Sequence, residues 1–93
     1  MNRDELIKLI EVKYPKLDVK TSEEFDGRPD GIWCSGEDGV EAEDGFDLFD
    51  YYAEDYAEKR YVFGIHKEFG RILKEYGWYA EWQDAGTLMI SKD

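Results

Sequence analysis

The hydrophobic positions near the amino terminus predict a helix. Apolar residues recur there at helical spacing, at Leu6, Ile7, Leu9, Ile10 and Tyr14. Asn2 is a suitable N-cap and Glu5 follows three residues later, so the two side chains can form a capping box with the first backbone amides. Pro15 lacks an amide hydrogen. We therefore expect a helix that begins after Asn2 and ends before Pro15.

Short apolar or alternating runs in the middle of the chain predict strands. Three runs have this character: Leu17 to Val19, Ile32 to Cys34, and Val40 to Glu43. The stretches beside them are rich in Gly, Pro and Asp, which favour turns: Asp26 to Gly31, Ser35 to Gly39, and Asp44-Gly45. The turn at Asp44-Gly45 indicates a hairpin between the runs on either side of it.

The run from Phe46 to Tyr52 fits two kinds of element. Its dense aromatic residues favour a strand. The spacing of Phe46, Phe49 and Tyr56 also suits one face of a helix. Periodicity leaves both alternatives open, and we expect a strand.

The last third of the chain predicts a second helix followed by a hairpin. The helix has one apolar stripe, formed by Val62, Ile65, Phe69, Ile72, Leu73 and Tyr76. Gly64 and Gly70 lower its helix propensity, and Gly77 is suited to the position after its end. Beyond it, two alternating runs surround Asp84-Ala85-Gly86, which suits a three-residue loop with glycine in the left-handed conformation.

Together these elements predict one α+β domain that spans residues 1–93. Their order is α-β-(β-β-β)-α-β-β, and we expect two helices on one face of a mainly antiparallel sheet. The chain has 93 residues, with three Trp, seven Tyr and five Phe. Because disordered acidic chains are poor in aromatic residues, this composition indicates a folded protein.

Carboxylates are concentrated in the middle of the sequence. Of the 23 acidic residues, 14 lie between Thr21 and Glu58, where Arg28 is the one basic residue, so this stretch has a net charge of −13. The rest of the chain has nine acidic and 11 basic residues. A charge of this density destabilises the folded state, because the carboxylates repel one another. The net charge of −11 is therefore a property of one segment.

The charge and composition also limit the class of partner and the compartment. A strongly acidic protein is repelled by nucleic acid and by anionic membranes, whereas it attracts basic surfaces such as those of nucleic-acid-binding proteins. No stretch approaches the roughly 18 apolar residues of a membrane span, and the amino terminus does not resemble a signal peptide. A lone cysteine, Cys34, rules out an internal disulfide framework. We expect a cytoplasmic protein.

The sequence does not predict an enzyme. His66 is the one histidine and has no accompanying nucleophile motif, so a surface or packed role is expected. Cys34 lies in an apolar run, and nearby acids would raise its pKa, which favours a buried small residue. No glycine motif for phosphate binding is present, so we expect no nucleotide or other cofactor.

One acidic pattern resembles a cation-binding loop. Asp26, Asp30 and Glu37 occupy positions 1, 5 and 12 of an EF-hand-like loop, with Gly31 at position 6. However, Arg28 occupies a position that needs an oxygen ligand, and no helix is predicted on either side. The alternative interpretation is a small domain that binds or is stabilised by Ca²⁺ or Mg²⁺.

The acidic stretch itself is the strongest functional candidate. On two strands and their turns, its carboxylates would form a dense anionic ridge with aromatic residues behind it. Such a ridge can imitate the charge of duplex DNA and occupy a basic nucleic-acid site of another protein. The other interpretation is a solvated acidic face that keeps the protein soluble. The expected partner-binding residues are Glu37, Asp38, Glu41, Glu43, Asp44, Asp47, Asp50, Glu54 and Asp55.

Two stretches of the second half resemble known proteins. Phe49 to Asp55 (FDYYAED) and Gly77 to Ile90 (GWYAEWQDAGTLMI) are similar to small uncharacterised proteins of tailed bacteriophages. In size, acidity and fold class the chain also resembles phage anti-defence proteins, including anti-CRISPR inhibitors and DNA mimics. The first resemblance implies no catalytic or binding residues. Together with the acidic stretch, the two resemblances predict a non-enzymatic protein in the host cytoplasm that binds a basic surface of a nucleic-acid-handling host or defence protein.

Overall fold

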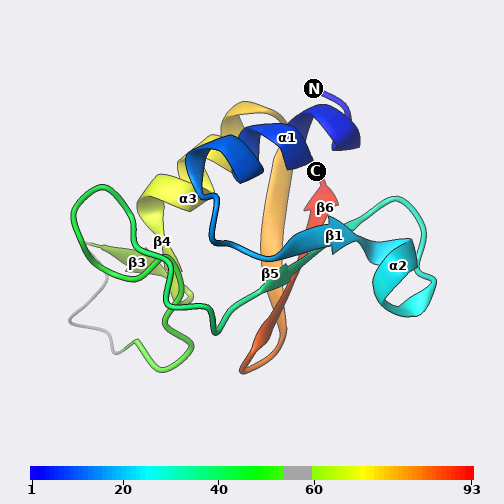
Figure 1. Cartoon of the computed structure of the whole chain (residues 1–93). Helices are drawn as coiled ribbons and strands as arrows, with labels where there is room; N and C mark the ends of the chain where they lie inside the picture. The colour runs from blue at the N-terminus through cyan, green and yellow to red at the C-terminus, as the bar shows by residue number, and fades with distance from the viewer. Residues whose placement is uncertain (54–59) are drawn as a thin grey trace.

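The fold is an α+β domain in which a four-stranded antiparallel sheet has the strand order β1-β2-β6-β5 (Figure 1). A computed structural model describes residues 1–53 and 60–93. Its elements, in chain order, are α1 (Arg3–Lys13), β1 (Val19–Thr21), α2 (Ser22–Asp26), β2 (Ile32–Ser35), β3 (Tyr61–Val62), β4 (Ile65–His66), α3 (Lys67–Glu75), β5 (Trp78–Asp84) and β6 (Thr87–Lys92). The predicted fold class is confirmed.

Helix α1 forms as its sequence predicts. The Asn2 side chain accepts a hydrogen bond from the Glu5 amide at 2.9 Å, and the Glu5 carboxylate accepts one from the Asn2 amide at 3.0 Å. The helix ends at Lys13, one residue before Tyr14 and two before Pro15. Among the described residues, no helix has the length and apolar character needed to cross a membrane.

Helix α2 is an element that the hydrophobic pattern did not predict. It is a single short helix whose N-cap, Thr21, forms a capping box with Glu24. Gly27 follows it in the left-handed conformation, with φ of 83°. The signal for this helix is therefore local, a threonine three residues before a glutamate, and it has no apolar periodicity.

The register of the sheet separates an inner and an outer face. Cys34, Leu88 and Trp82 are cross-strand neighbours on the inner face. One residue earlier on β2, Trp33 lies between Lys20 and Met89 on the outer face. This alternation follows from the two-residue period of a strand.

The core lies between the inner face of the sheet and the two longer helices. Helices α1 and α3 both lie over this face in Figure 1. The side chains that they contribute to it are at most 1% exposed: Leu6 and Ile10 from α1, and Phe69 and Leu73 from α3. They join Ile32, Cys34, Leu88 and Ile90 of β2 and β6 in one cluster. The predicted packing of two helices on one face of the sheet is confirmed.

The two central strands that the sequence predicted are not formed. Val40 to Glu43 and Phe46 to Tyr52 have irregular backbone, with isolated bridges that join Glu41 to Asp47 and Phe49 to Ile65. The turn at Gly45, with φ of 84°, is present as expected. Because like charges directly opposite each other destabilise a ladder, the Glu41–Asp47 pair opposes its extension. Neither the strand expected for Phe46 to Tyr52 nor the alternative helix occurs.

The second helix begins later than its apolar stripe predicted. Val62 and Ile65 lie in the β3–β4 hairpin, and the helix starts at Lys67. Phe63 and Gly64 form the hairpin turn with φ of 52° and 77°. A Cβ on Gly64 would lie 2.5 Å from the carbonyl oxygen of Asp50, so only glycine permits this approach. This tertiary contact overrides the helical spacing.

The terminal hairpin forms with a shorter loop than expected. Asp84 pairs with Thr87, so the loop has two residues and Gly86 does not adopt the left-handed conformation. The register shifts between Trp82 and Asp84, which marks a bulge. Gly86 instead lets the Glu37 side chain approach the loop closely, because a Cβ at position 86 would lie 2.6 Å from the Glu37 carboxylate.

Candidate protein-binding surface

Seven of the nine expected binding carboxylates lie on one irregular stretch, residues 36–53, which we call the acidic segment. They are Glu37, Asp38, Glu41, Glu43, Asp44, Asp47 and Asp50. Glu54 and Asp55 lie outside the described residues. The segment leaves the end of β2 and runs beside the β3–β4 hairpin (Figure 1).

Buried residues anchor the acidic segment to the core. Exposed acids alternate with Ala42, Leu48 and Phe49, which are 7%, 0% and 9% exposed. The Leu48 amide donates to the Val40 carbonyl at 2.8 Å, and the Leu48 carbonyl accepts from the His66 amide at 2.8 Å. The segment is therefore held by packing and by backbone hydrogen bonds although it contains no regular strand.

The anchored backbone brings four of the carboxylates close together. Glu41 and Asp47 are bridge partners across the hairpin-like turn. Asp47 also lines a cavity of about 370 Å³ with Glu37 and Asp38. These four side chains thus lie on neighbouring parts of one surface, although they are separated by up to ten residues in the sequence.

Among the described residues, lysine or arginine side chains pair with two carboxylates of the acidic segment. Lys13 of α1 lies 2.9 Å from Glu43, and Arg60 lies 3.4 Å from Asp44. Five carboxylates have no cationic partner among residues 1–53 and 60–93: Glu37, Asp38, Glu41, Asp47 and Asp50. Asp38 accepts only neutral donors, the Asp18 amide at 3.0 Å and the Ser35 hydroxyl at 2.9 Å. We call these five the open carboxylates.

His66 has a structural position at the start of α3. Its Nδ1 accepts the Glu68 amide at 3.0 Å, so this ring nitrogen is unprotonated and His66 is the N-cap of the helix. Nε2 then carries the proton and donates to Asp44 at 2.9 Å. The Phe46 amide and next the His66 ring lower the pKa of Asp44. The histidine is 7% exposed, so of the two roles that the sequence left open, surface or packed, the structure shows the packed one.

Cys34 lies in the core as a free thiol. Its side chain is fully buried on β2. Burial raises the pKa of the thiol well above its usual range, and the carboxylates of Asp38 and Asp18 raise it further. The predicted role of a small buried residue is confirmed.

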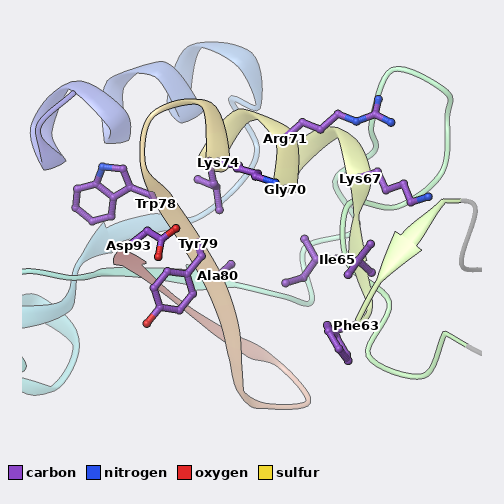
Figure 2. A pocket seen from close by; sticks show the side chains of 12 residues that line it. Phe63, Ile65, Lys67, Gly70, Arg71, Lys74, Trp78, Tyr79, Ala80 and Asp93 are labelled. Atoms are coloured by element: carbon purple, nitrogen blue, oxygen red, sulfur yellow. The ribbon is translucent and has the colours of Figure 1, made fainter.

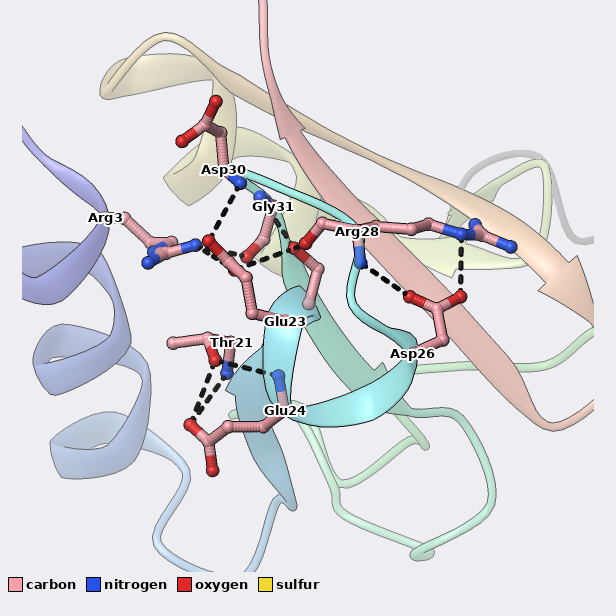
Figure 3. Close-up of polar contacts among 9 residues, drawn as sticks. Arg3, Thr21, Glu23, Glu24, Asp26, Arg28, Asp30 and Gly31 are labelled. Carbon is pink, nitrogen blue, oxygen red and sulfur yellow. Dashed lines mark hydrogen bonds and ion pairs between the residues drawn. The ribbon is translucent and has the colours of Figure 1, made fainter.

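The three candidate cation ligands do not converge. Figure 3 shows the carboxylates of Asp26 and Asp30 apart from each other. Asp26 is paired with Arg28, whose Nε lies 2.7 Å from it. Asp30 precedes β2 and Glu37 follows it, so the strand separates their side chains. Among the residues that the structure describes, no group of three or more His, Cys, Asp or Glu side chains is arranged to hold a metal ion. The alternative interpretation thus gains no geometric support.

Sequence reasoning missed the cations that partner the acidic segment. Lys13 is 30 residues from Glu43, and Arg60 is 16 residues from Asp44. No local spacing rule connects residues this far apart, so only the fold reveals these pairs. It also missed a basic row on α3, although the spacing of Lys67, Arg71 and Lys74 places them on one side of a helix.

Comparison of the chain with protein-family models, with curated proteins and with solved structures found no match.

Proposed function

We propose that this protein is a non-enzymatic interaction protein whose acidic segment binds a basic, nucleic-acid-handling surface of another protein. The observation that supports this most is the anchoring of the acidic segment by Ala42, Leu48 and Phe49. An anchored surface binds without the cost of ordering a flexible chain. The five open carboxylates are then held ready for lysine and arginine side chains.

The charge distribution favours a protein partner over nucleic acid or lipid. A net charge of −11 repels both phosphate backbones and anionic membranes. Basic nucleic-acid channels are suited to a dense row of negative charges, and electrostatic attraction would accelerate the encounter. A host or defence protein of a bacterium is the partner that the resemblance to phage proteins suggests.

The test uses bacterial proteins that immobilised heparin retains, since heparin selects basic nucleic-acid-binding proteins. This fraction is passed at low salt over the immobilised chain, and the bound proteins are eluted with duplex DNA. We expect DNA to displace a defined protein and moderate salt to abolish its retention. Retention that neither DNA nor salt weakens would contradict the proposal, as would the absence of any retained protein.

A matched pair of double variants distinguishes the contribution of the acidic segment to binding from that of net charge. Glu41→Gln with Asp47→Asn neutralises two open carboxylates on one surface. Glu11→Gln with Glu75→Gln changes the net charge equally, on exposed helical positions away from the acidic segment. We expect the first pair to lose retention and the second to keep it. Equal loss in both variants would indicate only a solvated acidic face that attracts cations unspecifically.

A further inference from the structure

A groove lies beside the free edge of β5, beneath α3 (Figure 2). It has a volume of about 550 Å³ and is bounded by α3, β5 and the β3–β4 hairpin. Ile65, Leu73 and Ala80 provide apolar lining. Binding pockets for organic groups are typically about 300–1,000 Å³ and mostly apolar, so the groove is large enough to take side chains of a partner.

One wall of the groove is basic. Lys67, Arg71 and Lys74 line it from α3, at positions that share one side of the helix. None of them forms an ion pair with another residue that the structure describes. Asp93 lies at the other end of the groove, beside Trp78 (Figure 2). Three cations on one wall favour an anionic occupant.

The neighbouring strand has an unpaired edge. β5 is the last strand in the order β1-β2-β6-β5, so within the described residues its outer peptide groups have no strand partner. The strand is seven residues long. Edge strands of this length readily add a further strand. The groove therefore offers backbone hydrogen bonds as well as an apolar floor.

An exposed aromatic residue stands at the rim. Phe63 lines the groove and is 90% exposed, and its neighbour Val62 is 51% exposed. Phe63 also has a φ of 52° in the hairpin turn, where Asn or Gly is normally favoured. A large apolar side chain in such a position gains nothing from the fold itself, whereas it can contact an occupant of the groove.

We propose that this groove binds an extended acidic peptide segment of a partner protein, which pairs with the free edge of β5 as a fifth strand. An apolar side chain of the peptide fills the space beside Gly70, where a Cβ would meet no atom within 4 Å. Carboxylates two residues before and after it point to the same face and pair with Lys67, Arg71 or Lys74. The groove is separate from the acidic segment, so this inference does not depend on the proposed function.

The probe is a fluorescein-labelled peptide, Thr-Glu-Thr-Phe-Thr-Glu-Thr, which presents Glu, Phe and Glu on one face of a strand. Binding is followed by fluorescence anisotropy at low and high salt. Replacement of both Glu by Lys should weaken binding at least about tenfold, because the groove wall is cationic. Methylation of alternate peptide nitrogens should also weaken it at least about tenfold, because strand addition depends on main-chain hydrogen bonds.

Two kinds of variant locate the site. Arg71→Gln with Lys74→Gln should weaken binding of the acidic peptide, whereas Lys8→Gln with Lys16→Gln, on other surfaces, should not. Gly70→Leu should fill the groove and block binding, and Gly70→Ala should weaken it less. Both substitutions at Gly70 favour a helix, so these variants should fold. Glu41→Gln with Asp47→Asn should bind the peptide as the unaltered protein does.

Several results would overturn the proposal. These are the absence of peptide binding, equal binding of the acidic and basic peptides, and unchanged binding of the N-methylated peptide. The protein could also bind decanoate but not the acidic peptide, with the binding of decanoate abolished in Gly70→Leu. This result would identify the occupant as a small amphipathic anion and contradict strand addition.

Discussion

Glu23 joins three parts of the chain at a single carboxylate. It lies 2.6 Å from Arg3 of α1, accepts the Asp30 amide at 3.3 Å, and belongs to the first turn of α2 (Figure 3). A hydrogen bond from its own backbone amide and the ion pair with Arg3 lower its pKa from 4.5 to about 2. The ionised carboxylate of Glu23 is thus more stabilised in the folded protein than in the unfolded chain.

This lowered pKa predicts a pH-dependent contribution to stability. Because the folded-state pKa lies below the unfolded-state value, the contribution is complete above pH 4.5 and is lost as the pH falls toward about 2. Glu23→Gln should therefore be less stable than the unaltered protein at neutral pH. The difference should shrink below pH 4.5, as measured by urea denaturation across this range.

Glu11→Gln provides the control for this residue. Glu11 is exposed on α1, and its carboxylate forms no hydrogen bond or ion pair with another described residue. Its substitution should leave the pH dependence of unfolding nearly unchanged. An identical acid profile for Glu23→Gln and the unaltered protein would show that the Arg3–Glu23 contact does not persist in solution.

The acidic segment obtains its order from packing, since its own sequence forms no extended ladder. Leu48 is fully buried and is followed by the buried Phe49, whereas Asp47 and Asp50 on either side of this pair are exposed. Its backbone joins Val40 on one side and His66 on the other. One leucine therefore couples the carboxylates to the β3–β4 hairpin and to the core.

Truncation of this anchor should destabilise the protein and loosen the segment. Leu48→Ala removes a fully buried side chain and should lower the free energy of unfolding by about 2–5 kcal/mol. Amide hydrogen exchange should accelerate first at Ala42 and Leu48, whose amides bond within the segment. Denaturant unfolding and exchange measured by NMR test both statements.

The control for the anchor is a truncation at an exposed apolar residue. Val12 is 82% exposed on α1, so Val12→Ala should change the stability very little. If Leu48→Ala lowered the stability without faster exchange in the acidic segment, the segment would not depend on this anchor.

At the scale of the whole molecule, charge is separated between two surfaces. The acidic segment carries the open carboxylates, and α3 presents three cations along the groove. Glu41 and Asp47 lie opposite each other without a cation between them among the described residues. The fold tolerates this repulsion because both side chains are exposed to water.

The repulsion predicts a salt-dependent stability. Glu41→Gln with Asp47→Asn should raise the free energy of unfolding by about 0.5 kcal/mol at low salt, since like charges opposite each other destabilise a bridge. At about 1 M salt, where the screening length is about 3 Å, the gain should disappear. Urea unfolding at both salt concentrations measures this difference.

The pair Glu11→Gln and Glu75→Gln changes net charge by the same amount without relieving this contact. It should stabilise the protein less at low salt. An equal effect of the two pairs would show that overall charge, and not the Glu41–Asp47 approach, determines the salt dependence.

Local patterns were sufficient for the elements whose interactions are local. Asn2 and Glu5 are three residues apart, and the capping box that they predict begins α1. The alternation around Trp78 to Trp82 and Leu88 to Ile90 predicted a hairpin, and β5 and β6 form one. In such cases, neighbouring residues supply both the conformation and most of its stabilising contacts.

Patterns failed where contacts between distant residues decided the conformation. The apolar spacing of Val62 and Ile65 fits a helix, yet the approach of Gly64 to the Asp50 carbonyl produces a hairpin. The acidic run was expected to form strands, but repulsion and core anchoring leave it irregular. These outcomes depend on the separation of segments in space, which hydrophobic periodicity does not contain.

The sequence by itself therefore determined the fold class, the terminal hairpin and the concentration of carboxylates between Thr21 and Glu58. Only the tertiary structure decided which carboxylates are paired with cations, which carboxylates share a surface, and where the basic groove lies. The reason is physical: caps, turns and alternation act over a few residues, whereas ion pairs such as Lys13–Glu43 and the walls of the groove form only when the packed core brings separate elements together.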